Sequence, residues 1–167
     1  MPGLALTPPL RSVVAPRALR RVGRAAGAAA ALSLVAAWVH LAYTASHWQD
    51  WWAYGAFFLG MGVFQGVSVP AIVHRPRSTP VALAVIAGNL AIVGMYVLSR
   101  TAGIPMGPHE GVVEEAGAID LAVTAAEVAV VACLVTLLRP LARRLVLNVL
   151  LGAGATLWLL CLADRLP

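Results

Sequence analysis

Five long apolar segments constrain the fold of this chain more than any other feature of its sequence. Each reaches the roughly 20 residues that an α-helix needs to cross about 30 Å of hydrocarbon. Because the bilayer core holds no water, a spanning segment must satisfy its own backbone polar groups, which leaves helices or a closed barrel. Barrel strands alternate over about ten residues, and this chain lacks such alternation. We therefore predict an all-α, polytopic bundle of five transmembrane helices, at about 22–46, 51–73, 80–99, 119–138 and 145–163.

The composition agrees with a chain whose main solvent is lipid. Hydrophobic residues make up 60% and charged residues only 11% of the 167 positions, well beyond an ordinary soluble domain. The net charge of +5 comes from arginines that flank the apolar segments, and no separate basic domain exists to bind nucleic acid. The expected partner is therefore the lipid bilayer, and nucleic acid is not expected.

The polar stretches between the apolar segments define the rest of the organisation. Residues 1–21 hold four prolines and four arginines, and they predict a short cytoplasmic basic tail before a transmembrane domain over 22–167. Pro76 and Pro80 are helix breakers and separate the second segment from the third. Residues 100–118 are rich in Gly, Pro and Glu and predict a long loop.

The distribution of arginine predicts the orientation of the bundle, because positive residues gather on the cytoplasmic side. One side holds Arg11, Arg17, Arg20, Arg21, Arg24, Arg75, Arg77, Arg139, Arg143 and Arg144, whereas the other holds Arg100 and Arg165. We therefore place the N-terminus in the cytoplasm and the C-terminus outside. Trp and Tyr favour membrane interfaces, and they fall in the outer half, at Trp38, Trp48, Trp51, Trp52, Trp158, Tyr43, Tyr54 and Tyr96.

A polar stripe on the fourth segment is the first candidate for chemistry. Asp120, Thr124 and Glu127 stand at i, i+4 and i+7, on one face of a helix. At the rise of a helix, Glu127 would lie about 12 Å deep, near the bilayer midplane. An ionisable group at that depth is costly and is a functional candidate by default. The structural alternative is a neutral Glu127 that only bonds neighbouring helices.

Two histidines on the first segment face the same way. His40 and His47 are seven residues apart, which places them on one helix face with Tyr43 and Thr44 beside them. Two turns separate them by about 10 Å, so a shared metal ion would need ligands from another helix. The structural alternative is a hydrogen bond from His40 within the bundle and an interfacial position for His47.

Polar residues elsewhere supply partners for these groups. Gln65 on the second segment and Asn89 on the third are expected as interhelical hydrogen-bonding groups. Asn89, Tyr96 and Arg100 form a stripe on the third segment. Arg100 at its outer rim is expected to pair with Asp120 or Glu127 of the fourth. The long loop carries four further ionisable residues, expected as a lid or cation funnel: His109, Glu110, Glu114 and Glu115.

Together these residues predict an outward-facing polar pocket that binds or moves a cation, either a transition metal or a proton. Imidazole and carboxylate ligands suit zinc, iron, nickel or copper(II) better than copper(I), so a divalent transition metal is the candidate cofactor. The competing hypothesis is a non-catalytic structural membrane protein, a small subunit of a membrane complex or a homo-oligomer. An enzyme that uses Glu127 or His40 as acid or base has no motif behind it, since P-loop, HExxH and GxSxG patterns are absent from the sequence.

Two stretches of the sequence carry a resemblance to known proteins. They are HLAYTASHWQDWWAYGAFFLGMGVFQ and SRTAGIPMGPHEGVVEEAGAIDLAVTAAE. Over about residues 33–138, the chain resembles a group of small polytopic membrane proteins of high-GC Gram-positive bacteria. The resemblance implies a multi-pass protein of the bacterial cytoplasmic membrane and carries no activity with it. The likeness lies in His40, Gly55, Phe58, Gln65, Arg100, Thr101, Gly103, Pro105, Gly107, Pro108, Asp120, Thr124 and Glu127.

Reporter fusions test the predicted orientation. Reporter domains attached after Arg77 and after Arg144 should read cytoplasmic, because arginine-rich ends stay inside. Those attached after Gly107 and after the C-terminus should read external. A cytoplasmic C-terminus would mean that one apolar segment, most simply the fifth, does not cross.

Overall fold

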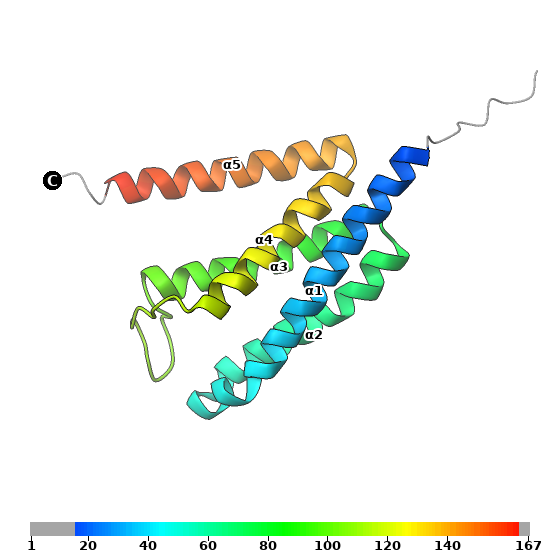
Figure 1. Cartoon of the computed structure of the whole chain (residues 1–167). Helices are drawn as coiled ribbons and strands as arrows, with labels where there is room; N and C mark the ends of the chain where they lie inside the picture. The colour runs from blue at the N-terminus through cyan, green and yellow to red at the C-terminus, as the bar shows by residue number, and fades with distance from the viewer. Residues whose placement is uncertain (1–15, 164–167) are drawn as a thin grey trace, which may run out of the picture.

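The computed structural model describes residues 16–163, and this part of the chain is all helical. The five helices are α1 Pro16–Asp50, α2 Trp52–His74, α3 Thr79–Thr101, α4 Ala118–Leu137 and α5 Pro140–Ala163 (Figure 1). All five are long and apolar enough to cross a membrane. The predicted fold class is therefore confirmed at the level of five helices that fit a multi-pass membrane protein, while the orientation stays a prediction. Most of the predicted tail, residues 1–15, lies outside the described residues.

The helices differ from the predicted segments mainly where charged residues flank them. Helix α1 begins six residues before the predicted start at Val22, and α5 begins five residues before Leu145. In both cases a proline, Pro16 or Pro140, is the first helical residue, a position where its missing N–H costs nothing. Arg, Ala and Leu favour helix and extend it beyond the apolar limit.

Helices α1 and α2 form a tight antiparallel hairpin. A single residue, Trp51, joins them, with an extended backbone at φ −165° and ψ 136° that reverses the chain. Glycines permit the close approach: a Cβ atom on Gly55 would lie 2.6 Å from the Cα atom of Trp48, and one on Gly62 would lie 2.7 Å from Cγ of Leu41. Small residues serve this purpose in membrane helices, where packing rather than water drives association.

The apolar core lies where α1, α3 and α4 come together. Helix α1 contributes small side chains, Ala26, Ala29 and Ala30, which let α4 approach closely. The remaining core side chains come from α2, α3, α4 and the residue after α4: Ile72, Ala82, Val85, Ile86, Val130, Val131, Leu134, Val135 and Leu138.

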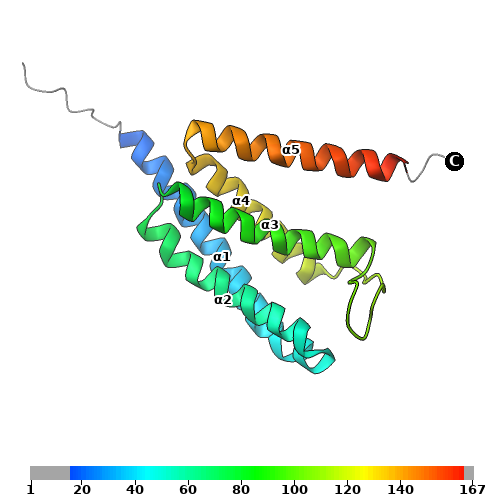
Figure 2. The same cartoon turned by 180° about the vertical axis from the view of Figure 1, so that it is seen from behind.

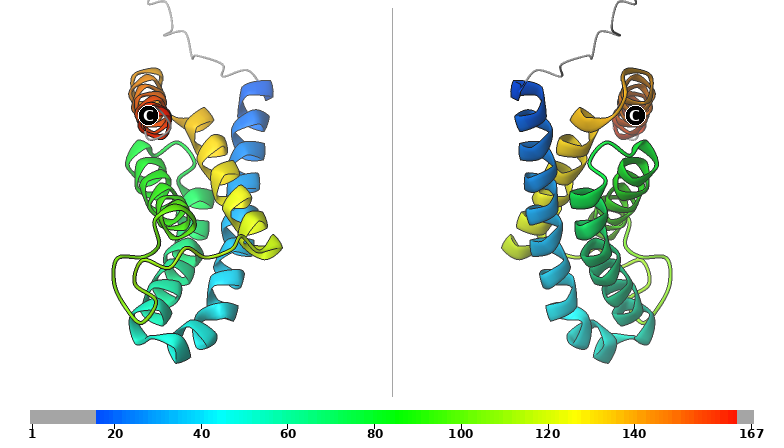
Figure 3. Two further views of the ribbon diagram at one scale, coloured as in Figure 1. Left: turned by 90° about the vertical axis from the view of Figure 1, so that its left-hand side faces the viewer. Right: turned by 90° about the vertical axis from the view of Figure 1, so that its right-hand side faces the viewer.

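The two helix pairs diverge away from this core. In Figures 1 and 2, the α1–α2 pair and the α3–α4 pair separate toward the end that carries Trp51 and the loop of residues 102–117. We call this end of the bundle the pocket end. Helix α5, seen almost end on in Figure 3, lies outside the group formed by α1 to α4.

Helix α5 is only lightly attached to the rest of the bundle. Ala142, Val146 and Leu150, on one of its faces, pack against the core as partly buried side chains. None of the residues of its apolar span, Pro140–Leu159, is buried inside the described chain. The outer surface of α5 is therefore left for lipid or for another protein.

Two alanine substitutions in α2 test the tight hairpin. Gly55→Ala places a methyl group against the backbone of Trp48 and should destabilise the protein by roughly 1–3 kcal/mol. Gly60→Ala is the matched control, because a Cβ atom there meets nothing within 4 Å, and it should be neutral or stabilising by roughly 0.5–1 kcal/mol. Unfolding midpoints in detergent measure both, and equal midpoints would contradict the close approach at Gly55.

Candidate functional site

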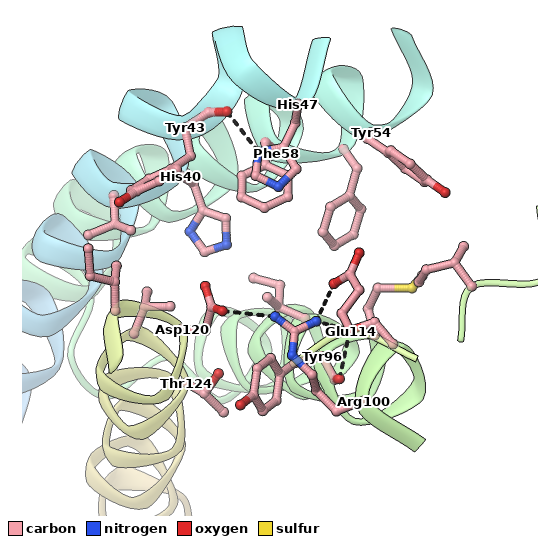
Figure 4. A pocket seen from close by; sticks show the side chains of 18 of the residues that line it. His40, Tyr43, His47, Tyr54, Phe58, Tyr96, Arg100, Glu114, Asp120 and Thr124 are labelled. Carbon is pink, nitrogen blue, oxygen red and sulfur yellow. Dashed lines mark hydrogen bonds and ion pairs between the residues drawn. The ribbon is translucent and has the colours of Figure 1, made fainter. Parts of the chain in front are cut away.

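A pocket of about 360 Å³ opens between the two helix pairs at the pocket end (Figure 4). Its lining comes from α1, α2, α3, α4, Trp51 and the loop of residues 102–117. The charged and polar residues at its wall are His40, Tyr43, His47, Tyr54, Tyr96, Ser99, Arg100, Glu114, Asp120, Thr124 and Glu127. The structure therefore brings together most of the polar residues that the sequence singled out, from segments far apart in the chain.

Aromatic rings form much of the wall. All three tyrosines of the chain line the pocket. His47 stacks on Phe58, with ring centroids 3.7 Å apart, and Trp51 meets Tyr54 edge to face at 5.0 Å. The six aromatic rings of the wall, histidines aside, are Tyr43, Trp51, Tyr54, Phe57, Phe58 and Tyr96.

An ionisable pair lies at the buried part of the wall. Nε2 of His40 is 3.7 Å from Oε1 of Glu127, and their side chains are only 5% and 1% exposed. Asp120 and Glu127 are seven residues apart and so lie on one face of α4. The polar stripe of α4 therefore runs from the open rim, where the Asp120 side chain is 43% exposed, to this buried pair.

A chain of hydrogen bonds from α3 and α2 reaches Glu127, and the backbone at its far end determines which groups donate and which accept. The amide nitrogen of Asn89 donates to the carbonyl oxygen of Val85 at 2.8 Å, which leaves Oδ1 of Asn89 as an acceptor. Nε2 of Gln65 donates both to this oxygen, at 3.4 Å, and to Oε1 of Glu127, at 3.3 Å. Oε1 of Gln65 is buried and has no hydrogen-bond partner among the described residues. Gln65 and Asn89 thus link α2, α3 and α4, as interhelical polar groups do.

The hydrogen bond of His40 determines which of its nitrogens faces Glu127 as an acceptor. Nδ1 lies 2.9 Å from the carbonyl oxygen of Ala36, and a carbonyl only accepts, so Nδ1 carries a hydrogen. In a neutral ring, Nε2 is then an acceptor. It faces an oxygen of Glu127, which accepts as well when ionised. The two groups are complementary only when at least one proton lies on the pair.

Arg100 organises the rim of the pocket. Its guanidinium donates to Oδ2 of Asp120 at 2.8 Å and also bonds Glu114 of the loop. The guanidinium carbon lies 4.9 Å from the ring centroid of Tyr96, within cation–π range. Of the two acids that the sequence offered as partners, Arg100 thus bonds Asp120 and not Glu127, because Glu127 lies two turns deeper on α4.

The loop is anchored beside the pocket by both side-chain and backbone bonds. The hydroxyl of Tyr54 donates to the carbonyl oxygen of Met106 at 3.0 Å, and the backbone N–H of Glu114 donates to Ser99. Of the four loop residues expected as a lid or funnel, only Glu114 lines the pocket. The other three, His109, Glu110 and Glu115, are exposed and lie outside its lining.

The predicted donors do not form a metal centre. Within residues 16–163, the described side chains contain no cluster of three or more His, Cys, Asp and Glu that fits a metal ion. Nδ1 of His47 bonds the carbonyl oxygen of Tyr43, and Asp120 is engaged by Arg100. The pair of His40 and Glu127 alone is too few ligands for a zinc-type site, which takes at least three from the protein.

Sequence reasoning missed the aromatic and sulfur-containing part of the wall. Trp51 and Tyr54 were predicted as interfacial residues, because an aromatic side chain suits a membrane interface as well as a pocket. Phe57 and Met95 gave no signal of their own. The pairing of Arg100 with Glu114 depends on the path of a loop, which periodicity does not predict.

No family model, no curated protein and no solved structure matches this chain. The resemblance of residues 33–138 to small polytopic membrane proteins thus stays a prediction.

Substitution of Arg100 tests how the rim is held. Arg100→Gln removes the bonds to Glu114 and Asp120 and should loosen the loop by about 1 kcal/mol, because both carboxylates are partly solvated. Hydrogen exchange of the backbone amides over 103–117 should then quicken roughly fivefold. Arg77→Gln is the control, since Arg77 is exposed and makes no ion pair with any described residue. Unchanged exchange in both variants would mean that the bond from Tyr54 and the backbone bonds hold the loop without Arg100.

Proposed function

We propose that this chain is a multi-pass protein of the bacterial cytoplasmic membrane whose pocket binds cations, and that His40 and Glu127 together hold an exchangeable proton. The observation that carries the proposal is the direct approach of two buried acceptors, Nε2 of His40 and Oε1 of Glu127, at 3.7 Å. Two acceptors at this distance attract each other only through a proton. Ionisable residues inside a membrane commonly mark such proton sites.

The charge of the pair supports one bound proton. With one proton the pair is neutral overall, either as imidazole and carboxylic acid or as imidazolium and carboxylate. With none it carries one buried negative charge, and with two it carries one buried positive charge. An uncompensated buried charge costs several kcal/mol, so each departure from one proton requires a compensating ion in the pocket.

A proton fits the site better than the transition metal that the sequence also suggested. A metal needs at least three ligands in close array, and the described residues provide no such cluster. A proton needs only the two acceptors that already face each other. The amide of Gln65 also lies nearby, and its oxygen could in principle bind a metal. However, its nitrogen and not its oxygen faces Glu127, and an N–H group bonds a carboxyl group but does not bind a metal.

A second candidate function is that of a structural membrane protein or small subunit of a complex. The exposed α5 favours it, because a span with no buried residue offers a whole surface to another protein or to a second copy of the chain. In that case Glu127 stays neutral throughout and serves only as an interhelical hydrogen-bonding group with Gln65.

Glu127→Gln separates the two functions. The amide keeps the size of Glu127 and has no exchangeable proton. At the position of Oε1, its oxygen accepts from Gln65 or its nitrogen donates to Nε2 of His40, but not both at once. We expect the variant to fold and to resist heat in detergent at least as well as the wild type. In a potentiometric titration it should bind about one proton fewer, and infrared difference spectra between acid and alkaline pH should lose one buried carboxyl band.

The exposed Glu115→Gln is the matched control and should keep that buried band. If the wild type and Glu127→Gln give the same difference spectrum between acid and alkaline pH, Glu127 does not exchange a proton and the structural function is favoured. A Glu127→Gln variant that fails to assemble would contradict both accounts, because it would mean that the fold requires a permanent charge at this position.

A further inference from the structure

We propose that the pocket takes a small organic cation, an amine or quaternary ammonium with an apolar or aromatic group, and that this cation replaces the proton of His40 and Glu127. This inference rests on the proposed proton site and adds the class of ligand that exchanges with it. The size, wall and charge of the pocket each point to such a ligand.

The volume and wall fit an organic molecule and not a bare ion. About 360 Å³ lies within the range of small-molecule pockets, which are mostly apolar with a few placed polar groups. Trp51 and Tyr54 meet at 83° and so form a corner of two ring planes. Phe58 adds a further ring, stacked under His47 and 5.5 Å from His40. Walls of several aromatic rings are the recognition element for alkylated ammonium groups.

The charge of the wall favours a cation. Three carboxyl groups and one guanidinium line the pocket, those of Glu114, Asp120, Glu127 and Arg100. Even with Glu127 neutral, the two rim carboxylates exceed the single guanidinium by one negative charge. An anion would have to displace a carboxylate from Arg100, which already bonds both of them.

The pocket already holds one cation against an aromatic ring. The guanidinium of Arg100 lies over Tyr96, 4.9 Å from its centroid, while the rings of Tyr43, Trp51 and Phe57 have no such partner among the described residues. A second cation bound among these rings would lie in the same cavity as Glu127. The carboxylate could then give up its proton without leaving an uncompensated buried charge.

The exchange conserves charge within the cavity. One positive charge enters as the ammonium and one leaves as the proton of the pair, so the buried region stays neutral before and after binding. The other titratable or charged groups around the pocket are Tyr43 and His47 on α1, Tyr54 on α2, Tyr96 and Arg100 on α3, Glu114 in the loop and Asp120 on α4. Of these, Arg100, Glu114 and Asp120 are engaged with one another at the rim.

Calorimetry on the full chain in lipid nanodiscs tests the proposal. The probe is benzyltrimethylammonium, whose charge is fixed at every pH, so that any proton released comes from the protein. Its uncharged analogue of the same shape is neopentylbenzene, and phenylmethanesulfonate supplies the anion. Empty nanodiscs correct for partition into lipid. Titrations in two buffers of different ionisation enthalpy count the protons released.

We expect benzyltrimethylammonium to bind at least tenfold more tightly than the other two probes and to release up to one proton. Trp51→Leu should weaken this binding roughly tenfold. Trp52→Leu is the matched control, since Trp52 is 63% exposed and lies outside the lining, and it should leave binding unchanged. Glu127→Gln should abolish the proton release.

Three results would overturn the inference. Equal or tighter binding of neopentylbenzene or the sulfonate would refute the class of ligand, and the absence of binding by all three probes would refute the pocket as an organic-cation site. Binding of the ammonium probe without proton release would refute the exchange. The proton site itself is judged separately, because its titration and infrared spectra use the protein without ligand.

Discussion

Two buried acceptors that face each other, Nε2 of His40 and Oε1 of Glu127, are the interaction on which this site depends. In water such a pair would simply be hydrated. Inside a bundle of apolar helices, it needs a proton or a cation, because an unpaired buried charge costs several kcal/mol. The bond from His40 to Ala36 and the bond from Gln65 to Glu127 fix both acceptors in place. Rotation of either side chain away from the other would break one of these bonds.

The fold creates the space for that pair by packing closely in one place and diverging in another. Small residues of α1 and the glycines of α2 bring backbones together, whereas aromatic side chains line the open space between the two helix pairs at the pocket end. Arg100 then ties the loop and the start of α4 to α3 through two carboxylates. The site is thus open on one side, and its most polar groups are divided between a partly solvated rim and a buried pair.

Much of this arrangement follows from helical periodicity, and the rest does not. The spacing of Asp120, Thr124 and Glu127 places them on one face, and the cost of polar groups in lipid turns that face toward the bundle. Periodicity does not predict how α1 and α4 pack against each other. It therefore could not predict that His40 approaches Glu127, or that the described residues contain no metal cluster. Nor does it distinguish a tyrosine at a membrane interface from one in a pocket, as Tyr54 illustrates.

The position of the pair within an aromatic cavity, rather than at the bundle surface, is what makes proton and ligand interdependent. At a surface, salt and water would screen a carboxylate from an ammonium group that is more than about 8 Å away. In the cavity both compete for the same buried negative charge, and each must lower the affinity of the other by the same factor, since coupling between two binding events is reciprocal. The affinity for a cationic ligand that fills the apolar pocket and replaces the proton would therefore depend on the pH of the side on which the pocket opens. Such a dependence needs no movement of the helices, because it follows from the requirement that the buried site stay neutral.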